Sequence, residues 1–167
     1  IDCLPNNAGK NIINYLHKNY NWDPTLTLSG KKNFHTNNID LNKLRSGNIK
    51  FDETKFDYKV IDNLIKYEKN FLSWIEDASG WNFNFNQRVQ FYYDLLKFWY
   101  QNLKKNKIEL LVAFGWPHTV GDYSLYLICK HHLNIPILYL NPFPFLNKNF
   151  FTISNDIHNM SSSFDKT

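Results

Sequence analysis

The segment from residue 108 to residue 139 constrains the fold more than any other part of the chain. It opens with an apolar run, residues 108–114, and closes with a second one, residues 135–140. Between them lie a loop, residues 115–119, and a stretch of helical length, residues 120–132, that is apolar almost all round. Short apolar runs bounded by Gly and Pro are typical of buried strands. Two such strands flanking a helix predict a β–α–β unit with a parallel sheet.

The same segment predicts where a ligand would bind. In open parallel sheets, ligands occupy the crevice beyond the carboxyl ends of the strands. Here those ends correspond to the loop at residues 115–119 and to residues 141–146, which we expect to form a stiff loop. Any chemistry of this chain is therefore expected at these two places.

The rest of the chain predicts an α/β protein. Helical spacing of apolar residues covers residues 11–20, 59–77 and 86–106, and short strands are expected at residues 25–28 and 150–153. Residues 30–55 are polar and predict a long loop, with at most a turn of helix near residues 41–44. We expect a three-layer Rossmann-like sandwich, built on a short, mainly parallel sheet and two long aromatic-rich helices. The pattern of these two helices fits packing on their own sheet and also fits a homodimer.

Composition sets limits on the class of protein. The chain has 167 residues, of which 43% are hydrophobic and 17% aromatic, so we expect one globular domain over residues 1–157 with a frayed tail at 158–167. The net charge of +4 comes from lysines interleaved with acidic residues, which argues against a nucleic-acid partner. No apolar run reaches the roughly 18 residues of a transmembrane segment. The two cysteines lie in no metal-binding spacing, and we expect no metal site.

His118 is the strongest candidate for a catalytic residue, because an imidazole exchanges a proton near neutral pH and can act as a general base on a hydroxyl group. Asp122, in the first turn of the following helix, is the second catalytic candidate. It would orient His118 or hold a sugar hydroxyl. The alternative is structural: His118 and Thr119 simply end the loop, and Asp122 caps the helix.

Four further residues are candidates for substrate binding. Trp116 can stack on a sugar ring, although core packing explains an aromatic residue equally well. Thr119 and Tyr123 flank the catalytic candidates in the sequence. Asn141 ends the second predicted strand, where its amide could meet a ligand or begin an Asn-Pro turn.

Four collinear segments resemble the N-terminal region of bacterial capsule and surface polysaccharide biosynthesis proteins, which are glycosyltransferase-like and common in marine microbes. They are residues 19–24 (NYNWDP), 66–72 (KYEKNFL), 88–99, and the segment from Pro117-His118 through Asp122-Tyr123 to Cys129-Lys130. The chain departs from the family in two respects. The family usually begins with a full first strand, which we expect to be missing or clipped before Ile1. Residues 142–148 place a Pro-Phe-Pro-Phe sequence where members often carry a basic residue.

The resemblance implies the acceptor-side half of a two-domain glycosyltransferase. Its partners would be a sugar or glycan acceptor and a missing C-terminal domain that binds the nucleotide-sugar donor, so we expect no cofactor in this chain and no activity from it alone. It implies a cytoplasmic protein, or one at the inner membrane surface. The alternative function is a non-catalytic α/β domain that binds a ligand or a protein. A small hydrolase would need a nucleophile beside His118, and Ser124, the nearest in sequence, is poorly placed for that role.

Overall fold

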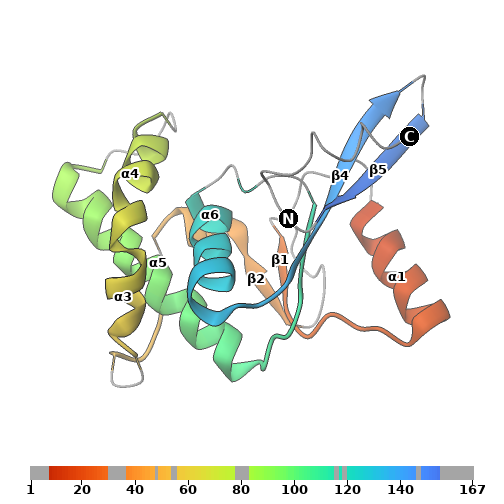
Figure 1. Ribbon diagram of the computed structural model, residues 1–167, viewed down its shortest axis with the longest axis horizontal. Coiled ribbons are helices and arrows are strands. Elements are labelled where there is room, and N and C mark those ends of the chain that lie inside the picture. The colour runs from red at the N-terminus through yellow and green to blue at the C-terminus, as the bar shows by residue number, and fades with distance from the viewer. Residues whose placement is uncertain are drawn as a thin grey trace. The chain divides into compact units, whose positions relative to one another are not determined.

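The computed structural model divides the chain into two compact units. The strand unit comprises Ile1–Leu41, Leu110–Trp116 and Ile137–Thr167, and the helical unit comprises Asn42–Glu109 and Pro117–Pro136. The structure describes residues 8–29, 37–47, 49–53, 56–77, 83–114, 117, 120–145 and 148–154 of these units. Each unit is described by itself below (Figure 1). The expectation of one domain ending at residue 157 stays a prediction.

The strand unit begins with helix α1, Ala8–Tyr20, which confirms the helix predicted at residues 11–20. The helix ends because Asn21 adopts a left-handed backbone conformation with φ of 54°. The Trp22 amide then donates to the Leu16 carbonyl at 3.3 Å, which closes the last turn. Asparagine tolerates this conformation better than most residues do, so the presence of Asn21 explains why α1 ends at this point.

Two short strands follow α1 and pair with each other. Strand β1, Thr27–Ser29, lies parallel to β2, Asn38–Asp40. Strand β2 was missed by the sequence patterns, which placed residues 30–55 in a loop. It is only three residues long and carries one apolar residue, Ile39, so it shows no alternation that periodicity could detect.

A second sheet contains the β–α–β unit that the sequence predicts. Strand β3, Leu111–Phe114, pairs in parallel with the first part of β4, Ile137–Phe145, in a register running from Leu111 opposite Ile137 to Phe114 opposite Leu140. The connection between the two strands contains helix α6, Val120–Ile128. The chain is therefore an α/β protein, with two parallel strand pairings and one antiparallel pairing in the part that the structure describes.

The expectation of a loop at residues 141–146 is wrong. Strand β4 continues through Asn141 to Phe145 and pairs there with antiparallel strand β5, Lys148–Ser154. The Pro-Phe-Pro sequence suggested a loop because proline has no N–H to give to a sheet. Proline is nevertheless tolerated at sheet edges, and β3 pairs with β4 only as far as Leu140.

The helical unit contains the remaining elements. Its helices are α2 (Leu41–Arg45), α3 (Lys59–Leu64), α4 (Glu68–Asp77), α5 (Phe85–Lys105) and α6. The 3₁₀ turn η2, Ile65–Tyr67, separates α3 from α4, and the π-helical turn η3, Cys129–Leu133, follows α6 directly. The single helix expected at residues 59–77 is therefore interrupted. The Glu68 amide donates to the carbonyl of Ile65, three residues back, rather than to that of Leu64.

Helix α5 is the longest element, and its sequence specifies both of its ends. Asn84 and Gln87 form a capping box at the N-terminus, in which each side chain accepts from the backbone amide of the other. At the C-terminus Lys107 is left-handed, with φ of 50°, and the Ile108 amide donates to the Leu103 carbonyl at 3.0 Å. This is the Schellman arrangement that closes helices.

The core of the helical unit lies where α3, α4, α5 and α6 meet. Its fully buried side chains come from all four helices and η3, and they are Val60, Leu64, Phe71, Tyr92, Leu95, Leu96, Trp99, Leu127, Ile128 and Cys129. Every residue of α6 and η3 from 121 to 129 is buried, which confirms that the apolar surface of this segment is enclosed. Burial of this apolar surface is the main stabilising contribution, at about 25 cal/mol per Å².

Candidate functional site

The structure describes only part of the site that the sequence predicts. Trp116, His118 and Thr119 lie outside the described residues, so the general-base role of His118 stays a prediction. Asp122 and Tyr123 are described, and both lie in the first turn of α6. The candidate site is therefore built here around that turn.

Asp122 is buried, with 3% of its surface exposed, at the N-terminal end of α6. A carboxylate at this end of a helix is stabilised by the helix dipole. Two hydrogen bonds to the Gly121 carbonyl stabilise this turn. The Trp99 indole N–H donates one at 2.9 Å, and the Ser124 hydroxyl donates the other at 3.0 Å. The backbone that carries Asp122 is therefore anchored to helix α5.

Ser124 is not arranged as a nucleophile. Its side chain is fully buried, and its hydroxyl proton is donated to the Gly121 carbonyl within the same helix. A serine nucleophile needs a base that accepts this proton. The hydroxyl of Ser124 thus stabilises the first turn of α6 through a hydrogen bond.

Tyr123 connects α6 to α4. Its hydroxyl is hydrogen-bonded to the side chain of Asn70, and 7% of the residue is exposed. Burial raises the pKa of Tyr123 above its ordinary value, the Asn70 hydrogen bond opposes this rise, and Tyr67 adds to it. The phenol is consequently protonated at neutral pH and acts as a hydrogen-bonding group rather than a base.

A group of tyrosines around Glu68 was not recognised in the sequence. We call Tyr67, Tyr92, Tyr93, Tyr123 and Glu68 the tyrosine cluster. The Tyr93 hydroxyl donates to the Glu68 carboxylate, and burial together with this contact raises the pKa of Tyr93 to about 12. Burial also raises the pKa of Tyr92, and all four other members of the cluster raise it further. The phenols of Tyr92, Tyr93 and Tyr123 are thus held in their protonated form.

One sequence signal could have located this cluster. Glu68 lies on the apolar stripe of the helix predicted at residues 59–77, where a carboxylate needs a partner. Arg88, early in the next helix, is a basic residue that could pair with it. In the structure the group that reaches Glu68 is the Tyr93 hydroxyl, and the Arg88 guanidinium donates from Nε to the Phe83 carbonyl at 3.1 Å.

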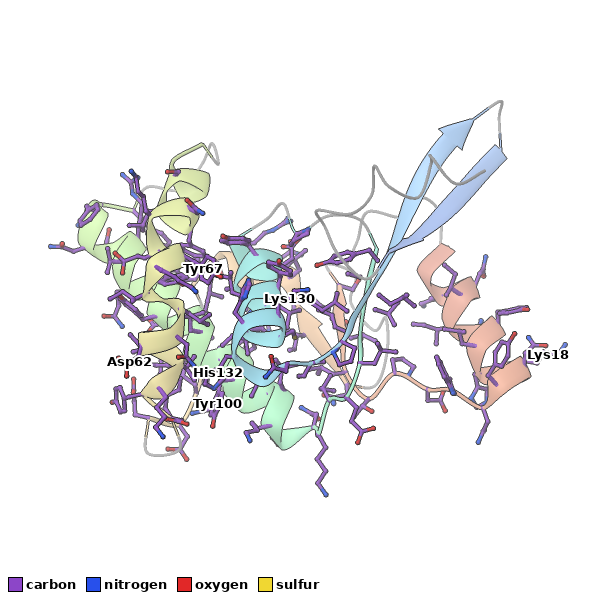
Figure 2. All side chains as sticks on the ribbon, in the orientation of Figure 1. Lys18, Asp62, Tyr67, Tyr100, Lys130 and His132 are labelled. Carbon is purple, nitrogen blue, oxygen red and sulfur yellow. The ribbon has the colours of Figure 1, made fainter. Side chains whose placement is uncertain are left out.

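Ring contacts connect the cluster to η3. Tyr67 stacks on His131 with ring centroids 4.7 Å apart, and Tyr126 meets His131 edge to face at 5.8 Å. His132 contacts other groups: its Nδ1 lies 3.1 Å from the Asn63 amide nitrogen, and its ring packs edge to face on Tyr100, beside it in Figure 2. The pKa of each histidine is lowered, chiefly by burial, so both imidazoles are neutral at pH 7.

Asn141 occupies a different place from the one expected. It does not end a strand but lies within β4, opposite Thr152 of β5. It is nevertheless the first residue beyond the parallel pairing with β3, which finishes at Leu140. Asn141 therefore keeps its position at the carboxyl end of the parallel part of this sheet, where ligands of α/β proteins bind.

The described residues contain no group of three or more His, Cys, Asp or Glu side chains placed to hold a metal ion. Among the helices that the structure describes, none has the length and apolar character needed to cross a bilayer. Comparison of the chain with protein families, curated proteins and solved structures found no match.

Proposed function

We propose that this chain is the acceptor-side domain of a glycosyltransferase in surface polysaccharide biosynthesis. The observation that carries the proposal is the position of Asp122. This buried carboxylate lies in the anchored first turn of α6, four residues after His118, in the connection between two parallel strands. Connections of this kind carry the ligand sites of α/β proteins.

In the proposed reaction, an acceptor hydroxyl attacks the anomeric carbon of an activated sugar. His118 takes the proton from that hydroxyl as the new glycosidic bond forms, and the bond between the sugar and the nucleotide phosphate breaks. Asp122 either orients His118 or holds a hydroxyl of the acceptor. Thr119 and Tyr123 would contribute to the acceptor site, and the substrate-binding roles of Trp116 and Asn141 stay predictions from the sequence. Hydroxyl and amide groups next to aromatic rings are the usual composition of small-molecule sites.

The proposal requires a second domain. The nucleotide sugar would bind to a donor domain outside this chain, and this chain itself would be a three-layer Rossmann-like sandwich with a short, mainly parallel sheet. This assembly would work in the cytoplasm or at the inner membrane surface, where activated sugars are available. A homodimer through the aromatic helices is compatible with it.

The test uses the full-length protein with its donor domain, a nucleotide sugar and the glycan acceptor. We expect His118→Ala to lower kcat by about 10²–10⁴-fold while acceptor binding is retained. Asp122→Asn should lower kcat with little change in the far-UV circular dichroism. The matched control is Tyr58→Phe, because Tyr58 is 61% exposed and lies away from α6 in the sequence. Unchanged transfer by His118→Ala would reject the proposal.

A binding domain without catalysis is the second candidate function, and the tyrosine cluster favours it. Burial raises the pKa of Tyr92, Tyr93 and Tyr123, and the Glu68 carboxylate is already bonded to Tyr93, so these phenols do not act as bases. In the same assay this function predicts unchanged transfer by His118→Ala. Acceptor binding would instead be weakened by Tyr123→Phe.

A further inference from the structure

Three exposed aromatic rings lie together where helix α1 ends. Tyr15 and Tyr20 belong to α1 and Trp22 follows it, and between 57% and 59% of each residue is exposed. The ring centroids of Tyr15 and Tyr20 are 6.1 Å apart, and those of Tyr20 and Trp22 are 6.4 Å apart. We call these three residues the aromatic patch. Adjoining exposed rings, unlike single ones, often mark a binding surface.

The backbone at the end of α1 positions the aromatic patch. Asn21 turns the chain through its left-handed conformation, and its amide donates to the His17 carbonyl at 2.9 Å. This turn places the Trp22 ring against that of Tyr20. The His17 Nδ1 lies 3.0 Å from the Asp23 carboxylate, which holds the residue after Trp22 close to the same turn. These contacts all lie within one short stretch of chain, so the rings are positioned locally.

The chemistry of the patch is aromatic and polar. The aliphatic side chains of α1, Ile12, Ile13 and Leu16, are half-buried, whereas the exposed rings carry hydroxyl and indole N–H groups. Asn19 and Asp23, which lie beside the rings in the sequence, are also exposed. A sugar presents C–H groups on its ring faces, which stack on aromatic rings, and hydroxyl groups, which bond to polar side chains. The composition of the patch matches this combination.

Charge distinguishes a sugar from other ligands that contact aromatic rings. Helix α1 contains two lysines, Lys10 and Lys18, the second of which Figure 2 labels, and it contains no Asp or Glu. An anionic lipid surface is typically recognised by clusters of about four to eight Lys or Arg residues. A nucleotide likewise needs cations for its phosphates. Two lysines, with the Asp23 carboxylate next to Trp22, favour a neutral ligand.

We propose that the aromatic patch binds a neutral glycan chain. Successive sugar rings stack on the aromatic rings, and their hydroxyls bond to the Asn19 amide and the Asp23 carboxylate. The ring planes are inclined to one another by 62° and 52°, so the patch fits a curved glycan better than a flat one. It belongs to the strand unit, whereas Asp122 belongs to the helical unit. The patch is therefore a second site, and its binding of glycan does not depend on sugar transfer.

The test is a titration of the intact chain with maltohexaose, a curved neutral glycan, and separately with cellohexaose, a flat one. NMR follows the Trp22 indole N–H signal, which is assigned from its absence in Trp22→Phe. We expect a saturable shift of this signal, at lower concentrations of maltohexaose than of cellohexaose. Failure of both sugars to give a saturable shift would overturn the proposal.

A sedimentation experiment tests the membrane surface as the alternative occupant. The chain is mixed with vesicles of phosphatidylserine and phosphatidylcholine, and we expect it to stay in the supernatant. Pelleting with the vesicles that Trp22→Ala abolishes would assign the patch to a lipid surface and overturn the proposal.

Variants test whether the rings themselves bind the sugar. We expect Tyr20→Ala and Trp22→Ala each to weaken maltohexaose binding about tenfold, measured by calorimetry. Trp22→Phe should keep most of the affinity, because it keeps a ring. Tyr58→Ala is the matched control, since Tyr58 is also an exposed aromatic residue but belongs to the helical unit.

Two results with these variants would contradict the proposal. One is equal affinity of Trp22→Ala and the unmodified chain, and the other is a loss in Tyr58→Ala as large as that in Trp22→Ala. Because His118 and Asp122 are unchanged in all of these variants, either result would leave the proposed transfer reaction to its own test.

Discussion

The Tyr92 hydroxyl donates a hydrogen bond of 2.7 Å to the carbonyl of Leu64, the residue at which α3 ends. In a continuous α-helix this carbonyl would accept from the amide of Glu68, four residues later. That amide instead donates to Ile65, because η2 takes a 3₁₀ turn. Tyr92, fully buried on α5, therefore supplies a donor to a carbonyl that the break leaves without its helical partner. The break is thus supported by a side chain from another helix.

Tyr92→Phe tests this support. We expect a loss of about 1–3 kcal/mol in the free energy of unfolding, since removing one partner of a buried hydrogen bond leaves the other unsatisfied. Urea denaturation followed by far-UV circular dichroism measures the change. Tyr58→Phe removes a hydroxyl from a residue that is 61% exposed and should change stability by less than about 0.5 kcal/mol. Equal stability of Tyr92→Phe and the unmodified chain would show that α3 and α4 do not need this bond.

Trp99→Phe tests the anchor of α6. The Trp99 side chain is 1% exposed, and its indole N–H donates to the Gly121 carbonyl at 2.9 Å. The substitution removes both the donor and part of the packed volume, so we expect a loss of about 2–4 kcal/mol. Hydrogen exchange should also accelerate most at the first turn of α6. Trp22→Phe is the control, because Trp22 is 57% exposed, and a comparable loss in both variants would contradict the anchoring role.

The sequence predicted those elements whose signals are local. The bounds of the interrupted helix and of α5 agree with the expected ranges within about one residue, because apolar periodicity acts over a few positions. The β3–α6–β4 order was also predicted, since two buried strands and a buried helix leave uninterrupted apolar runs.

The features that were missed depend on partners distant in sequence. The break at Leu64 is stabilised by Tyr92, 28 residues away, and no local pattern distinguishes it from a continuous helix. The extension of β4 through Pro142 and Pro144 depends on pairing with β5. At the candidate site, Asp122 and Tyr123 were expected in the first turn of α6 and are found there, whereas the partners of Glu68 and His131 required the packed helices.

Acid should destabilise the helical unit through its two adjacent histidines. Burial lowers the pKa of both His131 and His132 below the ordinary value of 6.5. In the unfolded chain these imidazoles take up protons near that value, whereas the folded chain takes them up only at lower pH. The unfolded state therefore binds more protons in this window, and folding stability falls as the pH drops from about 7 towards 5.

Urea denaturation at several pH values measures this dependence. The double variant His131→Gln/His132→Gln should show a shallower fall in unfolding free energy over the same interval, since neither side chain then titrates. The single variant His17→Gln is the control, because His17 is exposed on α1 of the strand unit. An identical pH dependence in the double variant and the unmodified chain would assign the acid sensitivity to other groups.

Cys129 should be unreactive as long as the chain is folded. It is fully buried at the start of η3, and burial raises the pKa of its thiol to about 12. Because the thiolate is the nucleophile, both its low abundance and its lack of access should slow alkylation. In the variant Cys3→Ser, which leaves Cys129 as the one cysteine, iodoacetamide should label the protein only at the rate at which the helical unit opens. Urea should accelerate labelling in parallel with unfolding, and Tyr92→Phe should raise the rate in the absence of urea. Rapid labelling of the folded Cys3→Ser chain would contradict the burial of this thiol.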